Sequence, residues 1–324
     1  MCIAFFIPAS SLAQSVTPFD TFNQSPIIQI HGLPAIGSAR VLSPDRNRYR
    51  LTTDIASNST RKQQGNEDVL FDGETKRLTF SYAQGLGENL EWGIRFPYVS
   101  HEGGSLDGFI EDWHDFFGLP QGGRDAGPRN QFIYRYSRNG NTLLDFTNAT
   151  GGLGDVRING AWQWLGAKRP NETSVALRAS LSVLSGDSDK LFGSGAMDTA
   201  IWVSADRTRS WFNFPGGLWG GGGVLFLGKG DVLANQQRDI ALFGSIGGGA
   251  KVWSRVSLKL QMDIHTALYD KSSLIQISGN AMQIIMGGDI AINKNVRLDL
   301  AVKEDLTVHA SPDVVFHVGL TVDN

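Results

Sequence analysis

The sequence contains a single cysteine, Cys2, among 324 residues. It lies in residues 1–13, which carry no charge, are mostly apolar and end in Ser11-Leu12-Ala13, with small residues at positions −3 and −1 before Gln14. This pattern resembles the end of a secretory signal peptide that is cleaved after Ala13. The mature chain would then hold no cysteine, which excludes disulfides, thiol nucleophiles and zinc–thiolate sites.

Positive charge is also lacking at the start of the chain, because no lysine or arginine precedes Arg40. A signal peptide ordinarily begins with a positively charged region. We interpret its absence as a start codon assigned too far downstream; the alternative is a buried N-terminal strand.

An excess of charge of one sign is missing as well, since 29 basic and 32 acidic residues give a net charge of −3. A nucleic-acid-binding protein needs a basic excess to neutralise phosphates, so we exclude that class of function. Long apolar runs are missing too, because the uncharged stretches 210–228 and 272–288 are interrupted by glycine, proline or polar residues. Neither has the character of a membrane-spanning helix. Nucleotide-binding, kinase and metalloprotease motifs do not occur, and we predict no cofactor and no metal.

What the sequence has instead is glycine, aromatic residues and a strict alternation of apolar and polar side chains. It holds 39 Gly, 18 Phe and 8 Trp, and 41% of its residues are hydrophobic. Between 256 and 264 the apolar residues are Val256, Leu258, Leu260, Met262 and Ile264, and polar residues separate them. A period of two predicts half-apolar strands, because a helix would show a period near 3.6.

Twelve segments show this alternation, namely 46–58, 74–84, 90–98, 154–164, 173–184, 196–206, 211–228, 239–250, 256–267, 280–292, 296–304 and 313–323. The connections alternate in length along the chain. The short ones are 85–89, 166–172, 207–210, 251–255 and 293–295, and the long ones are 59–73, 99–153, 185–195, 229–238, 268–279 and 305–312. An even strand number with short turns on one rim and long loops on the other predicts an all-β fold, a transmembrane antiparallel up-and-down β-barrel. Fourteen strands are the alternative if residues 26–42 supply strands.

Periodicity alone does not tell which face of the strands contacts lipid. A soluble barrel or sandwich would turn its apolar face inward and its charged face to water. The signal peptide, the cysteine-free mature chain and the alternating loop lengths favour the outer membrane, as do aromatic residues near strand ends such as Trp92, Trp162 and Trp211. We therefore predict the cell outer membrane as the location, with its lipid and the barrel-assembly machinery as partners.

The predicted organisation is a signal peptide at 1–13, an N-terminal periplasmic segment at 14–45, and a barrel at 46–324 with an insertion at 99–153. Segment 14–45 has four prolines and few charges, which is typical of extended chain, and it is either a plug that threads the lumen or a tether. Within the insertion, residues 132–136 and 142–146 flank Asn139-Gly140, a dipeptide that predicts a hairpin.

Several phrases of the sequence resemble a known family. They are Asn23-Gln24-Ser25-Pro26 with Gly32-Leu33-Pro34, the acidic–aromatic run Leu106–Pro120 (LDGFIEDWHDFFGLP), and Gly193-Ser194-Gly195. They resemble an uncharacterised Gram-negative family, known as a domain of unknown function and regarded as an outer-membrane β-barrel. The resemblance implies a fold and a compartment, but no substrate and no catalytic residues. One departure is the C-terminal Val322-Asp323-Asn324, where outer-membrane barrels often end on an aromatic residue that aids assembly.

The run 106–120 also holds the densest group of candidate functional residues, on a predicted short helix in the long extracellular loop. These are Glu111, Asp112, His114 and Asp115, with Glu111 and Asp115 on one helix face. One hypothesis is a constriction element inside the lumen that offers carboxylates to a cationic or sugar-like solute. The others are a calcium site, a carboxylate pair for acid–base catalysis, and an amphipathic helix whose aromatics dock on the barrel while its acids face water.

Further candidates for solute contact lie on the polar faces of the predicted strands. Asp263 and His265 point into the lumen together, but no Gly-x-Ser-x-Gly phrase supplies a nucleophile, which favours a structural role for the pair. Arg178 and Arg297 belong to the predicted lumen charges, with Arg50, Asp54, Arg77, Glu91, Arg95, Asp155, Arg157, Asp198, Asp289, Asp299 and Lys303. Because six of these are acidic and seven basic, strong ion selectivity is not expected.

The leading hypothesis is a channel or facilitated-diffusion pore for a small hydrophilic or amphipathic solute, without chemistry and gated by the 106–120 element. One alternative is an outer-membrane enzyme that acts on lipid or glycan through Asp112, His114 or the Asp263/His265 pair. Another is a non-conducting structural or adhesion barrel.

Overall fold

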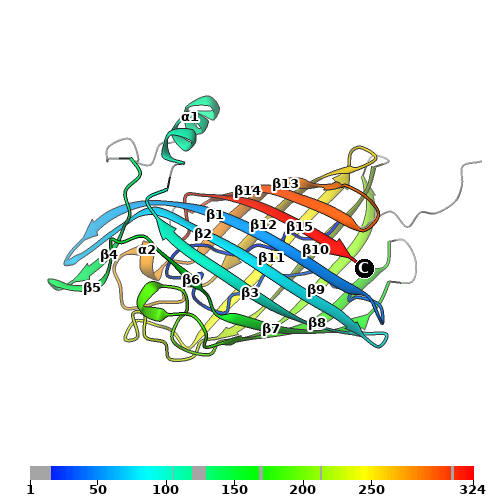
Figure 1. The fold of residues 1–324 in the computed structure, drawn as a ribbon, viewed down its shortest axis with the longest axis horizontal. Coiled ribbons are helices and arrows are strands. Elements are labelled where there is room, and N and C mark those ends of the chain that lie inside the picture. The colour runs from blue at the N-terminus through cyan, green and yellow to red at the C-terminus, as the bar shows by residue number, and fades with distance from the viewer. Residues whose placement is uncertain (1–15, 105, 119–128, 168–170, 212–213, 308–309) are drawn as a thin grey trace, which may run out of the picture.

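A computed structural model describes residues 16–104, 106–118, 129–167, 171–211, 214–307 and 310–324 (Figure 1). Most of the described residues form the strands of one barrel wall. The wall strands are β1 (Asn47–Gln64), β2 (Glu67–Leu86), β3 (Leu90–Glu102), β7 (Val156–Leu165), β8 (Thr173–Val183), β9 (Thr199–Trp211), β10 (Phe214–Phe226), β11 (Ile240–Lys251), β12 (Val256–His265), β13 (Ala281–Ala291), β14 (Val296–Asp305) and β15 (Val314–Asp323). The other elements are α1 (Asp107–Phe117), β4 (Ile133–Arg138), β5 (Asn141–Phe146), β6 (Thr150–Leu153), a 3-10 turn (Ser188–Lys190) and α2 (Ile275–Ser278). The predicted signal peptide, residues 1–13, lies outside the described residues.

Each wall strand pairs antiparallel with the next one along the chain, and β1 pairs with β15 to close the cylinder. The closing register runs from Arg48↔Asp323 to Ser57↔Val314. This closure gives hydrogen-bonding partners to the two strands that would otherwise be sheet edges. The prediction of a closed antiparallel barrel of 12 strands is therefore confirmed, and the alternative in which residues 26–42 supply two more wall strands is wrong.

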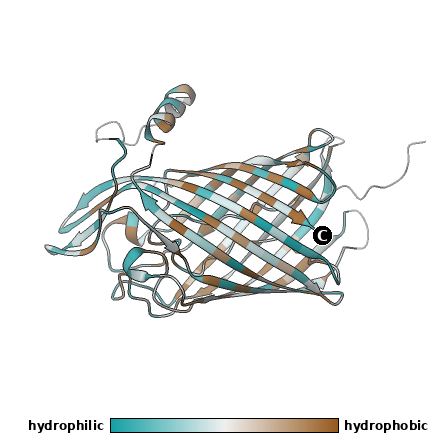
Figure 2. Ribbon diagram, viewed as in Figure 1, coloured by the Kyte–Doolittle hydropathy of each residue, from teal (hydrophilic) through white to brown (hydrophobic). Residues whose placement is uncertain are grey.

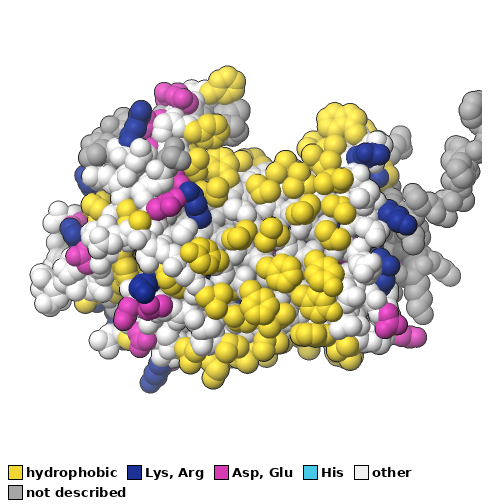
Figure 3. Space-filling model, viewed as in Figure 1, with side chains coloured by type: hydrophobic (Ala, Val, Ile, Leu, Met, Phe, Trp, Pro, Cys, Tyr) yellow, Lys and Arg dark blue, Asp and Glu magenta, His cyan; other side chains and the backbone are white. Residues whose placement is uncertain are grey.

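The apolar face of the wall points outward. In β12, Leu258 and Leu260 are each 53% exposed, whereas Lys259 and Gln261 are only 4% and 1% exposed. Figure 2 shows the same alternation along the other strands, and Figure 3 shows apolar side chains gathered in a belt across the face in view, with charged side chains beyond it at both ends. A soluble barrel would have the opposite arrangement, because water would have to solvate this belt.

Two predicted connections are strand in the structure. β1 and β2 continue through the predicted loop 59–73 and pair as far as Gln64↔Glu67, and β9 runs through the predicted turn 207–210 to Trp211. On β2, Val69 and Phe71 are buried, but residues 61–66 at the tip of the β1–β2 hairpin and residues 207–210 of β9 are polar and mostly exposed beyond the apolar belt. With water on both faces the hydropathy no longer alternates, although the backbone pairing continues.

The hairpin predicted within the insertion is confirmed. β4 and β5 pair antiparallel across a turn in which Asn139 and Gly140 have φ of 53° and 75°. Two successive residues with positive φ make the hairpin turn that matches the twist of the strands. β4 also pairs with β2 from Glu67↔Arg138 to Asp72↔Ile133, so the hairpin extends the sheet beyond the barrel wall.

The predicted loop helix is α1, and it lies outside the lumen near the rim that carries the long loops (Figure 1). Its Phe109 makes an edge-to-face contact with Phe316, at 5.7 Å between ring centroids. Phe316 shares the outward face of β15 with the exposed Val318. Neither helix in the described part of the chain is long and apolar enough to cross a membrane.

Candidate functional site: the filled lumen

Residues 16–42, here called the inner segment, lie inside the barrel (Figure 1). Phe19 N–H donates to Gln261 midway along the wall, and the chain turns over residues 26–30 near the long-loop rim, where Ile28 N–H and Gln29 N–H both donate to Ser25 O. It returns to the short-turn rim, where Leu42 N–H donates to Glu91. An extended segment cannot satisfy its own backbone groups, so the wall side chains must supply partners for them.

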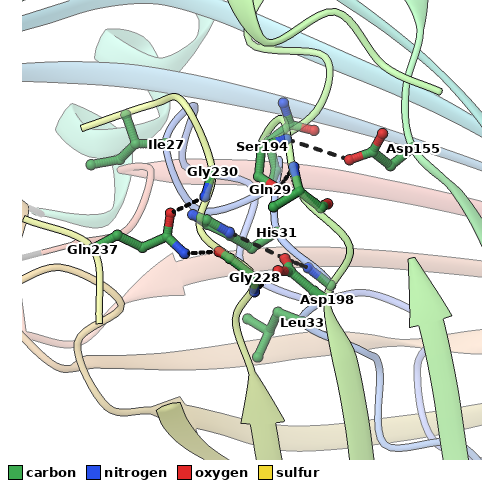
Figure 4. A network of polar contacts seen from close by, with 12 residues as sticks. Ile27, Gln29, His31, Leu33, Asp155, Ser194, Asp198, Gly228, Gly230 and Gln237 are labelled. Atoms are coloured by element: carbon green, nitrogen blue, oxygen red, sulfur yellow. Dashed lines mark hydrogen bonds and ion pairs between the residues drawn. The ribbon is translucent and has the colours of Figure 1, made fainter. Parts of the chain in front are cut away.

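The turn of the inner segment is fastened to the long-loop rim through Asp198 (Figure 4). The Asp198 carboxylate accepts from Gly32 N–H at 2.8 Å, from His31 Nδ1–H at 3.2 Å and from Gly228 N–H at 2.9 Å. Asp198 and His31 are 1% and 0% exposed, so these bonds form away from water. One buried carboxylate therefore joins the inner segment to the β10–β11 loop.

Tyr269 completes this contact from the β12–β13 loop. Its hydroxyl lies 2.8 Å from His31 Nε2 and 3.2 Å from Ile27 O. Burial, and secondarily the nearby Asp198 charge, raises the pKa of Tyr269 above its ordinary range. The hydroxyl therefore keeps its proton and can donate it within this group.

Asp155, also in Figure 4, makes a similar set of bonds that does not involve the inner segment. Its carboxylate accepts from Ser185 N–H at 3.0 Å, Gly186 N–H at 2.8 Å and Ser194 N–H at 3.4 Å. All three donors belong to the β8–β9 loop. Asp155 therefore orders a rim loop, while Asp198 connects the rim to the inner segment.

Cationic wall side chains bind the carbonyl groups of the inner segment. Arg157 donates from Nη1 to Leu33 O at 2.7 Å and from Nη2 to His31 O, and its guanidinium lies 4.7 Å from the Phe22 ring centroid. Lys303 Nζ, which is fully buried, donates to Phe22 O at 2.6 Å. Hydrogen bonds from charged donors are stronger than neutral ones, so these contacts hold the segment firmly.

The turn at residues 26–30 divides the inner segment into a first arm before it and a second arm after it, and an ion-pair cluster holds each arm. In the first arm, the Asp20 carboxylate contacts Arg50 Nη1 at 2.6 Å and also Arg95 Nη2. Burial opposes ionisation of Asp20, but the charges of Arg95 and Arg50 outweigh it and hold the pKa of this carboxyl well below its usual range. In the second arm, Asp206 of β9 accepts from Ser38 Oγ at 2.7 Å and from Ala39 N–H and Arg40 Nε at 2.9 Å each.

Four of the residues singled out in the sequence analysis lie on the wall strands and face the lumen. Arg178 donates from Nε to Ser38 O at 3.0 Å, and Arg297 Nε lies 3.4 Å from Asp299. His265 Nε2 lies 2.8 Å from Asn23 Nδ2, and its Nδ1 lies 2.8 Å from Thr266 O. Asp263 accepts from Gln261 Nε2 at 2.9 Å. The structure thus gives Asp263 and His265 separate partners rather than joining them as an acid–base pair.

The residues of the 106–120 run lie elsewhere. Glu111, Asp112 and Asp115 are on α1, outside the lumen, and Glu111 forms an ion pair with Arg129. The side chain of His114 and residues 119–120 fall outside the described part of the chain. In α1, Phe109 packs on the outer wall and Asp112 and Asp115 are exposed, as in the amphipathic-helix hypothesis, but Phe116 is 82% exposed.

Sequence reasoning did not identify the residues that fasten the inner segment. Asp20 and Asp206 received no role, and Asp54, Asp198, Arg157 and Lys303 were treated only as lumen charges. The inward position of the last four followed from strand parity, but no sequence signal pairs them with residues 16–42. Among the described residues, no group of three or more His, Cys, Asp or Glu side chains is placed to hold a metal ion.

Comparison with solved structures shows similarity to outer-membrane barrels. The COG4313 outer membrane channel from Pseudomonas putida F1 matches with a TM-score of 0.55 at 10% identity, over 88% of this chain and 98% of that chain. The NanC porin matches with a TM-score of 0.45 at 6% identity, over 85% and 98%. The translocator domain of the autotransporter NalP from Neisseria meningitidis matches with a TM-score of 0.42 at 10% identity, over 86% and 87%. The similarity to the COG4313 channel, at 10% identity, concerns the fold alone.

Comparison by sequence finds one family. No curated protein matches the chain, whereas the model of the family described as "Protein of unknown function (DUF3187)" matches residues 1–323.

Proposed function

The chain belongs to the DUF3187 family of unknown function, and we propose that it is an outer-membrane channel for a small hydrophilic or amphipathic solute, with the inner segment as a plug. The observation that carries the proposal is the pairing of an apolar outer belt with a polar lumen that holds a hydrogen-bonded segment. An apolar outer face with a polar interior is the arrangement of a β-barrel in lipid.

The location and partners belong to the same proposal. The outward residues of the belt are large and exposed, for example Leu242, Leu258 and Leu260, and outer-membrane lipid would cover them. Insertion of such a barrel would involve the barrel-assembly machinery. The short-turn rim, from which β1 starts and at which β15 ends, would face the periplasm, and the long-loop rim with α1 would face outward.

The contacts of the inner segment support a plug that can move. They include ion pairs of Asp20 with Arg50 and Arg95, and hydrogen bonds of the segment to Asp198, Asp206, Arg157 and Lys303, and water can replace such partners when the segment leaves the lumen. Release would also expose apolar side chains that are now buried, such as Ile27, Ile28 and Ile30, so the polar contacts lower the cost of movement without removing it. The gate is thus assigned to residues 16–42 rather than to the 106–120 element, and solute contact to the polar wall, including Arg178, Asp263, His265 and Arg297.

A reversible crosslink tests this function. Thr21 Oγ1 donates to Asp54 Oδ1 at 2.9 Å, so the double variant Thr21→Cys/Asp54→Cys, with Cys2→Ser, places two thiols within reach across the plug–wall contact. We expect solute flux into proteoliposomes when the pair is reduced and none when it is oxidised, with Asp54→Cys alone as the control that does not respond to oxidant.

The other outcomes separate the alternatives. Equal flux in the oxidised and reduced states would show that solute passes without movement of the inner segment. Absence of flux in both states, in protein that is folded in the bilayer, would contradict a channel and would favour a non-conducting structural barrel.

A further inference from the structure

A cavity of about 110 Å³ lies inside the barrel, between the two arms of the inner segment and the wall strands near the short-turn rim. Its charged lining is one-sided. Six arginines, Arg48, Arg50, Arg95, Arg157, Arg178 and Arg297, face it with only two carboxylates, Asp20 and Glu91. The near-balance of lumen charges in the sequence therefore hides a local concentration of positive charge.

The carboxylates do not neutralise these arginines one by one. Asp20 is shared between Arg50 and Arg95, and Glu91 lies 3.8 Å from Arg178. Beyond the lining, Asp323 lies 2.6 Å from Arg48, and Asp299 lies 3.4 Å from Arg297 but also contacts Lys259. Among the described residues, Arg157 has hydrogen bonds to the carbonyls of His31 and Leu33, but no carboxylate within ion-pair distance. Clustered cations that exceed their counter-charges attract anions from solution.

The lining also has hydrogen-bond donors to offer. A guanidinium carries five N–H donors, and among the described residues Arg50 bonds only through Nε, to Thr321, and Nη1, to Asp20. Within the same described ranges, Arg95 bonds only through Nη2, again with Asp20. Side-chain exposures of 18% and 21% show that water reaches both groups. Arginine presents its donors in a planar fork that matches the oxygens of a carboxylate or phosphate.

We propose that this cavity binds a small oxyanion, a carboxylate- or phosphate-bearing solute, and that Asp20 holds part of the same site in its absence. A cavity of about 150 Å³ accommodates benzene, so the space fits a phosphate ion or a small carboxylate. The incoming oxyanion competes with Asp20 for Arg50 and Arg95. Its binding thereby removes one fastening of the inner segment.

The inference rests on the proposed function, because it names the solute class of that channel and couples the solute to release of the plug. Binding itself is measurable without any flux. A folded protein that binds phosphate but does not conduct would refute the channel and leave the site standing. A protein that conducts but does not bind would refute the site alone.

The test uses the refolded full-length protein in a non-ionic detergent at low ionic strength, with inorganic phosphate and succinate as probes in separate calorimetric titrations. We expect Arg95→Gln to weaken phosphate binding about tenfold or more, because it removes charged donors from the site. Asp20→Asn is expected to strengthen binding, because it removes the competing carboxylate and nearly preserves the side-chain shape.

The matched control is Arg77→Gln. Arg77 is also a buried lumen arginine, with Nη1 on Gln29 Oε1, but it does not line the cavity. The Kd of this variant for phosphate should be within about twofold of the parent's, since the local electrostatic field rather than the net charge determines binding. Heat-modifiable gel migration verifies that each variant is folded. Equal weakening by both arginine variants, or no binding by either the parent or Asp20→Asn, would overturn the proposal.

Discussion

The contact between Asp198 and the inner segment allows a quantitative test, because Asp155 provides a matched control on the same rim. Both carboxylates are buried, and each accepts three hydrogen bonds. Only those of Asp198 reach the inner segment, through His31 and Gly32. In Asp198→Asn the amide NH₂ must face a buried N–H, and the remaining oxygen accepts as a neutral group. We expect the contact to weaken by about 2 kcal/mol.

The population of protein with a released inner segment should then rise about 30-fold, since 1.4 kcal/mol corresponds to a factor of ten. The assay is the labelling rate of Ser25→Cys by a bulky maleimide in a Cys2→Ser background, because Ser25 is 4% exposed and reacts only when the segment leaves the lumen. Asp155→Asn should leave this rate within about twofold of the parent. Equal rates in the parent and Asp198→Asn, or equal acceleration by the two variants, would show that the Asp198 contact does not hold the inner segment.

Three further changes test other parts of the account. In Gly32→Val, a Cβ would lie 2.7 Å from Asp198 Cβ. This overpacking should destabilise the seated inner segment by about 1–3 kcal/mol and so also speed the labelling of Ser25→Cys. An unchanged rate would show that the segment is already loose at Gly32. The lowered pKa of Asp20 means that its stabilising effect is present above the unfolded-state pKa of about 3.9 and is lost only as pH falls through the lower folded value. The difference in unfolding midpoint between the parent and Asp20→Asn should thus stay constant from about pH 8 to 5, and its disappearance in that range would contradict the ion pair. In urea titrations of protein folded into vesicles, Leu260→Arg on the outer belt should lower the free energy of unfolding by about 2–4 kcal/mol, and Gln63→Arg beyond the belt should leave it almost unchanged. Equal effects would argue against lipid around the belt.

The barrel was predictable because its periodicity follows directly from its surroundings. In β12 each apolar residue from Val256 to Ile264 faces outward and each polar one faces the lumen, so alternation reports the two environments. The prediction was wrong where the environments no longer differ. Residues 59–64 and 207–211 extend β1 and β9 into water, and their pairing leaves no trace in hydropathy.

The contents of the lumen were not predictable, for a different reason. Strand parity shows that Asp198 and Arg157 point inward, but their partners come from His31 and Leu33, far along the chain. Such pairings depend on how an irregular segment is threaded, and that path has no periodic signature. The position of α1 outside the lumen depends in the same way on tertiary contacts, such as that between Phe109 and Phe316.

Whether residues 16–42 plug a channel can be measured by single-channel recording in planar bilayers, with the intact protein compared to a variant that lacks these residues. The inner segment fills the lumen through contacts along its length. We therefore predict that the intact protein is closed most of the time and that the folded deletion variant conducts steadily. A folded deletion variant that remains silent, or that conducts no more than the intact protein, would contradict the assignment of residues 16–42 as the plug of a channel.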